Sequence, residues 1–183
     1  MIALPIAAKR AEIVEAVAKN DIVFVQGETG SGKTTQVPQY LYEALMEKQR
    51  ETGQPMGMIG VTQPRRVAAV NLATRVAFEM GRGRVGEGPV GYRVRFDEKM
   101  CAATRIKFLT YGMLLREAIL DKSLRAYSVI VLDEAHEREV NSDVLLALLK
   151  GIVKDERAND LKLVIMSATL DLAKFVNYFG VTT

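Results

Sequence analysis

The feature that most constrains the fold of this chain is an alternation of short apolar runs with longer amphipathic stretches. Each run has six to eight residues and is rich in Val, Ile, Leu or Met. Near-continuous apolar runs of this length are typical of strands buried on both faces of a parallel sheet. The runs are DIVFVQG (21–27), MGMIGVTQ (56–63), RIKFLT (105–110), YSVIVLD (127–133) and LKLVIMS (161–167).

Helical spacing of apolar residues marks the stretches between these runs. Residues 33–49 and 65–80 carry apolar side chains mostly at steps of three and four, and residues 111–120 and 142–153 are rich in Leu and Ile. Residues 81–91 hold five glycines and a proline, which predicts a loop. Strands and helices in alternation predict an α/β layer fold with a mainly parallel sheet.

The composition is compatible with one domain that has an aliphatic core. The chain has 183 residues, 49% of them hydrophobic, and no Trp. Cys101 is the single cysteine, so an intrachain disulfide is excluded, as fits a reducing compartment. No apolar run approaches 18 residues, which argues against a membrane-spanning helix.

Basic residues are concentrated in the middle of the chain. Residues 62–116 contain eleven Lys or Arg and four Asp or Glu, a balance of +7, so the rest carries −4 of the net +3. An excess of this kind favours a polyanionic partner. The alternative is a basic face that is simply solvated.

A glycine-rich loop follows the first apolar run and precedes the first helical pattern. GETGSGKTT (27–35) fits the phosphate-binding pattern G-x-x-x-x-G-K-T. Glycines let backbone N–H groups turn toward phosphate oxygens, and the helix adds its positive N-terminal end. Lys33 is expected to reach the β- and γ-phosphates and Thr34 to offer its hydroxyl to Mg²⁺. A structural turn is the alternative.

Two adjacent carboxylates follow the run VIVL. Asp133 is expected to hold Mg²⁺ through water, and Glu134 to orient and deprotonate an attacking water. The alternative is a strand end with exposed acids. His136, the single histidine, has no Cys or His nearby for a zinc site, so it is predicted to be a hydrogen-bonding group beside the nucleotide.

Four segments in order carry a family resemblance: GETGSGKTTQ, TQPRRVAA, DEAHER and SAT. With TRIKFLT and GMLLREA, they make residues from about 4 to about 179 resemble the first RecA-like domain of a eukaryotic-type DEAH-box RNA helicase of superfamily 2. The resemblance implies a RecA-like P-loop NTPase fold, a three-layer α/β/α sandwich, with ATP (other NTPs left open) and Mg²⁺. It also implies that residues 1–183 are one lobe, with a second RecA-like lobe and C-terminal regions absent. The fragment alone is expected to be nearly inactive.

The resemblance also assigns roles to individual residues. Lys33, Asp133 and Glu134 would be catalytic, and Thr34, Asp133 and Glu134 would hold the metal. His136 would couple the nucleotide site to Ser167 and Thr169 of SAT. Nucleotide contacts are implied for Gly27, Thr29, Gly30, Ser31, Gly32, Lys33, Thr34, Thr35 and Arg75, the last by stacking on the base.

RNA contacts are likewise placed by resemblance. Arg65 and Arg66 of TQPRR and Thr110 of TYGML would bind the RNA backbone. GYRVRF (91–96) resembles a turn near the RNA path, and Arg95 would be its RNA contact. The family normally has TDGML, so Tyr111 replaces an acid and puts the local RNA contact and the helix start in doubt.

The function implied is an ATP-dependent RNA helicase that unwinds RNA or remodels its complexes. Its partners would be RNA, the second lobe and a glycine-rich activator protein, with no membrane. An intracellular location is expected, with the nucleus or nucleolus favoured over the cytoplasm. The alternatives are an RNA-binding scaffold with a structural nucleotide, a small-molecule P-loop kinase and a DNA substrate.

Overall fold

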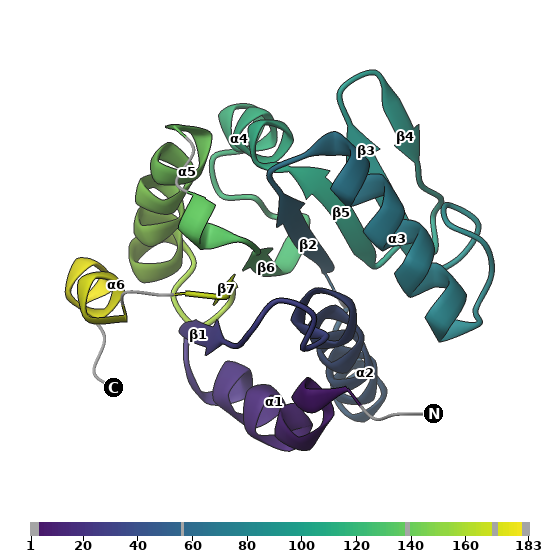
Figure 1. Ribbon diagram of the computed structural model, residues 1–183, viewed down its shortest axis with the longest axis horizontal. Helices are drawn as coiled ribbons and strands as arrows, with labels where there is room; N and C mark the ends of the chain where they lie inside the picture. The colour runs from purple at the N-terminus through teal and green to yellow at the C-terminus, as the bar shows by residue number, and fades with distance from the viewer. Residues whose placement is uncertain (1–3, 56, 138–139, 170–171, 181–183) are drawn as a thin grey trace.

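The computed structural model describes residues 4–55, 57–137, 140–169 and 172–180. They form a seven-stranded sheet with helices on both sides (Figure 1). The strands are β1 (Ile22–Gln26), β2 (Met58–Gln63), β3 (Val90–Val94), β4 (Asp97–Lys99), β5 (Ile106–Thr110), β6 (Tyr127–Leu132) and β7 (Lys162–Ser167). The helices are η1 (Pro5–Lys9), α1 (Arg10–Lys19), α2 (Lys33–Thr52), α3 (Arg66–Met80), α4 (Tyr111–Leu120), η2 (Ala135–Glu137), α5 (Val140–Gly151), η3 (Ile152–Glu156) and α6 (Leu172–Phe179).

The sheet has the order β1-β7-β6-β2-β5-β3-β4. Every neighbouring pair is parallel except β3 and β4, which form an antiparallel hairpin at one edge. All five apolar runs form strands, and the inner ones are buried on both faces as predicted, since five of the six residues of β2 are buried. The mainly parallel three-layer α/β fold is therefore confirmed.

Two apolar layers hold the helices on the sheet. One layer packs α1, α2 and α3 against one face, with Val37, Ala73 and Val76 fully buried. The other packs α4, α5 and α6 against the opposite face, where Leu114 and Leu145 are fully buried. Figure 1 shows the two groups of helices on either side of the sheet. None of the described helices is both long and apolar enough to cross a membrane.

The glycine-rich segment differs from the prediction at its end. A loop was expected over residues 81–91, but β3 begins at Val90. Pairing with β5 explains the difference, because Val90 and Gly91 align with Ile106 and Lys107 in a parallel ladder. Backbone hydrogen bonds to a distant strand thus override the local tendency of glycine to form a loop.

Candidate functional site

The predicted functional segments lie along the edge of the sheet that is formed by the carboxyl ends of its parallel strands. Gln26 at the end of β1 is in register with Ser167 of β7, and Gln63 of β2 is in register with Thr110 of β5. Leu132, the residue before the acidic pair, ends β6 between them. Ligands of open α/β sheets bind at this edge, so the topology brings together segments that are far apart in sequence.

The glycine-rich loop wraps around the Lys33 ammonium. Gly30 and Gly32 have φ of +85° and +94°, values that favour glycine. The Lys33 side chain is largely buried, and its Nζ donates to the carbonyl oxygens of Gly27 and Glu28, the latter at 2.9 Å. Ser31 Oγ lies 3.5 Å from the same nitrogen. A cation is therefore held inside a backbone loop that leads into α2, an arrangement suited to phosphate groups.

The other loop residues support this shape. Gly27 N–H donates to Ser167 O at 3.2 Å, which ties the loop to β7. Thr35 Oγ1 donates to Gly32 O at 3.3 Å, while Thr29 is exposed at the turn. The nucleotide contacts predicted for these residues remain predictions.

The side chains of Asp133 and Thr34 are in contact although the two residues are 99 positions apart in the sequence. Thr34 Oγ1 donates to Asp133 Oδ2 at 2.5 Å, and Gln63 Nε2 donates to the same oxygen at 2.6 Å. A hydroxyl and a carboxylate are the hard oxygen ligands that Mg²⁺ prefers, and Mg²⁺ commonly adds substrate phosphates and water. The described residues contain no cluster of three or more His, Cys, Asp or Glu that could hold a metal alone. The donor set therefore fits Mg²⁺ bound together with a nucleotide.

Burial changes the acidity of Asp133, which is 1% exposed. Desolvation raises the pKa of its carboxyl above the ordinary value, and hydrogen bonds from Thr34 and Gln63 oppose the rise. The ionised form is therefore costly in the isolated protein, a penalty that a bound divalent cation would relieve.

This cost predicts a pH-dependent stability. In the unfolded state, the Asp133 carboxyl loses its proton above pH about 4. In the folded state its pKa is raised, so it keeps the proton to a higher pH. Without Mg²⁺, this group should make the free energy of unfolding fall as pH rises from about 4 through the folded-state pKa. Urea titrations from pH 4 to 7 of the wild type and Asp133→Asn would measure it. Parallel pH profiles for the two proteins would contradict the assignment.

Glu134 has an unusual backbone conformation for a residue with a side chain. Its φ is +56°, and its N–H donates to Asp133 Oδ1 at 3.0 Å. A left-handed residue other than glycine costs about 1–3 kcal/mol and is often found at functional sites. The turn from β6 into η2 thus begins with a strained residue whose carboxylate is predicted to act on water.

The N-terminal segment closes over the glycine-rich loop. Ile6 N–H donates to Ser31 O at 3.2 Å. A Cβ added at Gly32 would lie 2.8 Å from Leu4 Cδ1 and 3.2 Å from Ile6 Cγ2. Leu4 and Ile6 would therefore have to shift to admit a side chain at the end of the loop.

Gly32→Ala should consequently destabilise the chain by about 2–4 kcal/mol, through left-handed strain and overpacking. The matched control is Gly53→Ala, because Gly53 also has a positive φ, +67°, but an added Cβ there meets nothing within 4 Å. It should cost only the conformational part, about 1–2 kcal/mol. Denaturant unfolding measures both; equal losses would show that Leu4 and Ile6 do not restrict the loop.

The residues predicted to couple the site lie on β7 and η2. Ser167 is fully buried and its Oγ donates to Thr169 O at 3.1 Å, which braces the turn after β7. His136 belongs to η2, which packs against β7, but its side chain lies outside the described part of the structure. Its coupling role stays a prediction.

Arg75 is tied to α2 through a carboxylate that sequence reasoning missed. Its Nε donates to Glu79 Oε1 at 2.6 Å, one turn away on α3. Glu79 Oε2 accepts from Gln36 and Gln39 of α2, at 2.8 and 2.9 Å. The Arg75 side chain is 64% exposed, so its face can receive a base. The i, i+4 spacing of Arg75 and Glu79 is the signal that could have revealed this pair.

The residues predicted to bind RNA lie along the same edge, beyond the acidic pair. Arg65 and Arg66 are exposed where α3 begins. Arg95 is exposed in the turn after β3, with its guanidinium 4.8 Å from the centre of the Phe96 ring. Thr110 ends β5 and precedes α4. Three strand ends thus present cations and a hydroxyl on one side, a pattern suited to backbone phosphates.

Tyr111 does not disturb the start of α4, which begins at this residue. Its side chain is 2% exposed, and its hydroxyl donates to the backbone oxygen of Asp133. This contact is not predicted by the sequence pattern, in which Tyr111 is only a departure from the family. The TQPRR segment is predicted to contact RNA alone, whereas Gln63 in that segment donates to Asp133.

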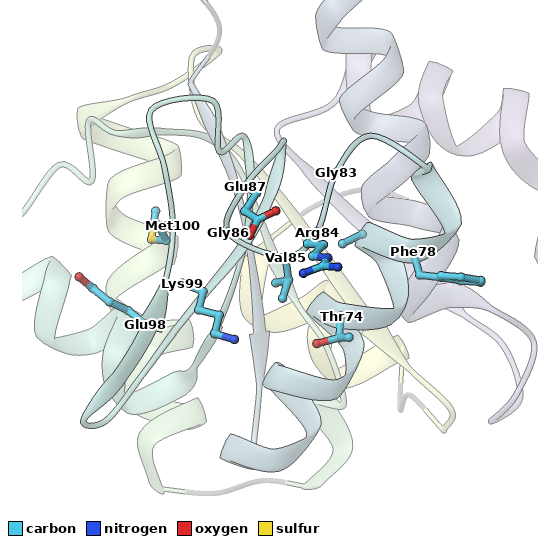
Figure 2. Close-up of a pocket in the computed structure, with 11 residues that line it drawn as sticks. Thr74, Phe78, Gly83, Arg84, Val85, Gly86, Glu87, Glu98, Lys99 and Met100 are labelled. Atoms are coloured by element: carbon cyan, nitrogen blue, oxygen red, sulfur yellow. The ribbon is translucent and has the colours of Figure 1, made fainter.

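A separate hollow of about 700 Å³ lies between the end of α3 and β4. Figure 2 shows Thr74 and Phe78 of α3 on one side, Glu98, Lys99 and Met100 on the other, and the loop 83–87 between them. None of the residues predicted to bind nucleotide lines it.

Comparison with known proteins agrees with this geometry. A family model described as DEAD/DEAH box helicase matches residues 8–176. The chain is 49% identical over 177 residues to a probable ATP-dependent RNA helicase, DHR2, of Saccharomyces cerevisiae, which covers 97% of this chain and 23% of that protein. It is 50% identical over 180 residues to the human ATP-dependent RNA helicase DHX33, covering 97% of this chain and 24% of that protein.

A third relative is the Arabidopsis thaliana pre-mRNA-splicing factor ATP-dependent RNA helicase DEAH10. It is 44% identical over 216 residues, covering 97% of this chain and 29% of that protein. The chain therefore spans about a quarter of the length of these relatives. With the phosphate-binding loop, the acidic pair and the parallel sheet in one arrangement, the chain belongs to the DEAD/DEAH box helicase family.

Proposed function

We propose that this chain is the ATP-binding lobe of an ATP-dependent RNA helicase. The observation that carries the proposal is the hydrogen bond between Thr34 and Asp133, which joins the glycine-rich loop to the acidic pair at the edge of the sheet. A simple structural turn gives no reason to bring a buried carboxylate to this hydroxyl. The names of the relatives, all RNA helicases, support the same substrate class.

Each part of the site has a task in ATP hydrolysis. The loop N–H groups and Lys33 would bind the phosphates, and Thr34, Asp133 and Glu134 would hold the metal. Bound Mg²⁺ would neutralise charge on the β- and γ-phosphate oxygens. Glu134 orients water and accepts its proton, and Arg75, held by Glu79, stacks on the base.

RNA would bind across the ends of β2, β3 and β5. Arg65, Arg66, Arg95 and Thr110 contact the backbone, which gives affinity without sequence readout. His136, Ser167 and Thr169 would couple ATP hydrolysis to movement of a second RecA-like lobe. A glycine-rich activator protein would bind that second lobe. The splicing factor among the relatives favours a nuclear location.

The test is ATP hydrolysis by the full-length protein with and without single-stranded RNA. The wild type should hydrolyse ATP faster with RNA, and Lys33→Ala should lose more than about 10²-fold, because the cation at the phosphates is removed. The 183-residue chain alone should be nearly inactive, since an arginine supplied from outside this lobe is worth about 10³–10⁵ in rate. Full biological activity of Lys33→Ala would favour the scaffold alternative.

A further inference from the structure

Tyr111 connects the end of β5, which is predicted to bind RNA, to the acidic pair Asp133 and Glu134. It directly follows Thr110, and in sheet order β5 is separated from β6 by β2. The Tyr111 side chain spans that distance inside the apolar layer that also contains Leu132 and Ala135. Its hydroxyl donates to the backbone oxygen of Asp133.

The carbonyl that Tyr111 holds belongs to the peptide between Asp133 and Glu134. The N–H of that peptide donates to Asp133 Oδ1 at 3.0 Å, so both polar ends of the peptide are bound. Glu134 follows with its φ of +56°. Since the orientation of a peptide plane sets the direction of the next Cα–Cβ bond, the tyrosine hydroxyl helps to determine where the Glu134 carboxylate points.

The hydroxyl is suited to this role because it can donate a hydrogen bond while remaining uncharged. An ionised carboxylate at position 111 would only accept, and would repel the Asp133 oxygen. The ring also brings its hydroxyl to the strand end from a rigid position, because Tyr111 is 2% exposed and packed in the core.

We propose that Tyr111 is a positioning residue that holds Glu134 in its hydrolytic orientation and links it to the RNA-contacting end of β5. The inference rests on the proposed function, since it concerns the rate at which Glu134 activates water. Tyr111 touches neither nucleotide nor water in this scheme; it acts through the Asp133 carbonyl.

The experiment compares Tyr111→Phe with the wild type in RNA-stimulated ATP hydrolysis by the full-length protein. The variant removes one oxygen and keeps the ring. We expect kcat to fall about tenfold, equivalent to about 1.4 kcal/mol of barrier, while KM for ATP changes less than about twofold. An unchanged kcat, or an equal change in KM, would overturn the proposal.

The matched control is Tyr127→Phe, because Tyr127 is also buried, 1% exposed, and its hydroxyl bonds to Glu117 and Lys107 away from the acidic pair. It should change thermal stability while leaving kcat within about twofold of the wild type. A loss of kcat equal to that of Tyr111→Phe would indicate a general effect of removing a buried hydroxyl and would overturn the proposal.

A double-variant cycle separates this role from a purely structural one. If Tyr111 acts through Glu134, adding Tyr111→Phe to the Glu134→Gln variant should lower the rate of single-turnover hydrolysis by less than about twofold. A full tenfold loss in that background would overturn the inference. Failure of the proposed function is distinguishable, because it would appear as absent RNA-stimulated hydrolysis in the wild type.

Discussion

Glu134→Gln should lower RNA-stimulated ATP hydrolysis by the full-length protein by about 10²–10⁴-fold. Glutamine has nearly the same shape but cannot accept the proton of an attacking water. The backbone N–H bond of residue 134 to Asp133 Oδ1 does not depend on the side chain, so the local turn should persist. Affinity for ATP should therefore change less than about threefold, which is under about 0.7 kcal/mol. Steady-state hydrolysis and nucleotide titration measure the two quantities.

Glu43→Gln is the control for this substitution. Glu43 lies on α2, and its carboxylate pairs with Arg10 at 2.5 Å with both side chains about half exposed. The same chemical change there should leave hydrolysis within about twofold, because exposed ion pairs contribute little. If Glu134→Gln kept wild-type hydrolysis, Glu134 would not be the base and the acidic pair would serve structure alone.

Glu117→Ala should destabilise the chain by about 3–5 kcal/mol, the usual cost of removing one partner of a buried ion pair. Lys107, with a side chain 4% exposed, donates to Glu117 Oε1 at 2.6 Å and to the Tyr127 hydroxyl at 2.8 Å. Tyr127 in turn donates to Glu117 Oε2 at 2.5 Å. Burial, followed by the charge of Glu117, raises the pKa of Tyr127 well above its ordinary value, so it remains a neutral donor.

Without Glu117, the Lys107 ammonium would remain desolvated beside the neutral Tyr127 hydroxyl, with no carboxylate from residue 117 to offset its charge. For a chain of this size, Tm should fall by about 6–20 °C. Calorimetry or denaturant unfolding of the 183-residue chain measures the change.

Two further variants test whether burial of the ion pair causes the loss of stability in Glu117→Ala. Glu12→Ala removes a pair with Lys9 whose side chains are 68% and 63% exposed, and it should cost at most about 1 kcal/mol. Lys107→Met combined with Glu117→Ala should recover part of the loss, since no charge is then left buried. A loss below about 1 kcal/mol for Glu117→Ala alone would mean that water reaches Lys107.

The strands and helices that build the fold could largely be predicted from local patterns. The apolar runs that became β1, β2, β5, β6 and β7 are signalled by residues within eight positions of one another. The hairpin of β3 and β4 was not predicted, because β3 follows a glycine-rich stretch and pairs with the distant β5, while β4 is short and charged and pairs with β3. The five residues of β3 include one glycine and one arginine, which obscure the alternation.

The functional site was likewise predictable only in the parts that local sequence patterns specify. The glycine-rich loop and the adjacent acids could be identified from the sequence alone, because these are local patterns with a defined chemistry. The groups that surround Asp133 depend on the folded chain: Thr34 and Gln63 donate to its carboxylate, and Tyr111 donates to its backbone carbonyl. Those partners come from three other elements, and no local pattern specifies them. The parallel register and the strand order β1-β7-β6-β2-β5 bring them together, and hydrogen bonds of this kind require that packing.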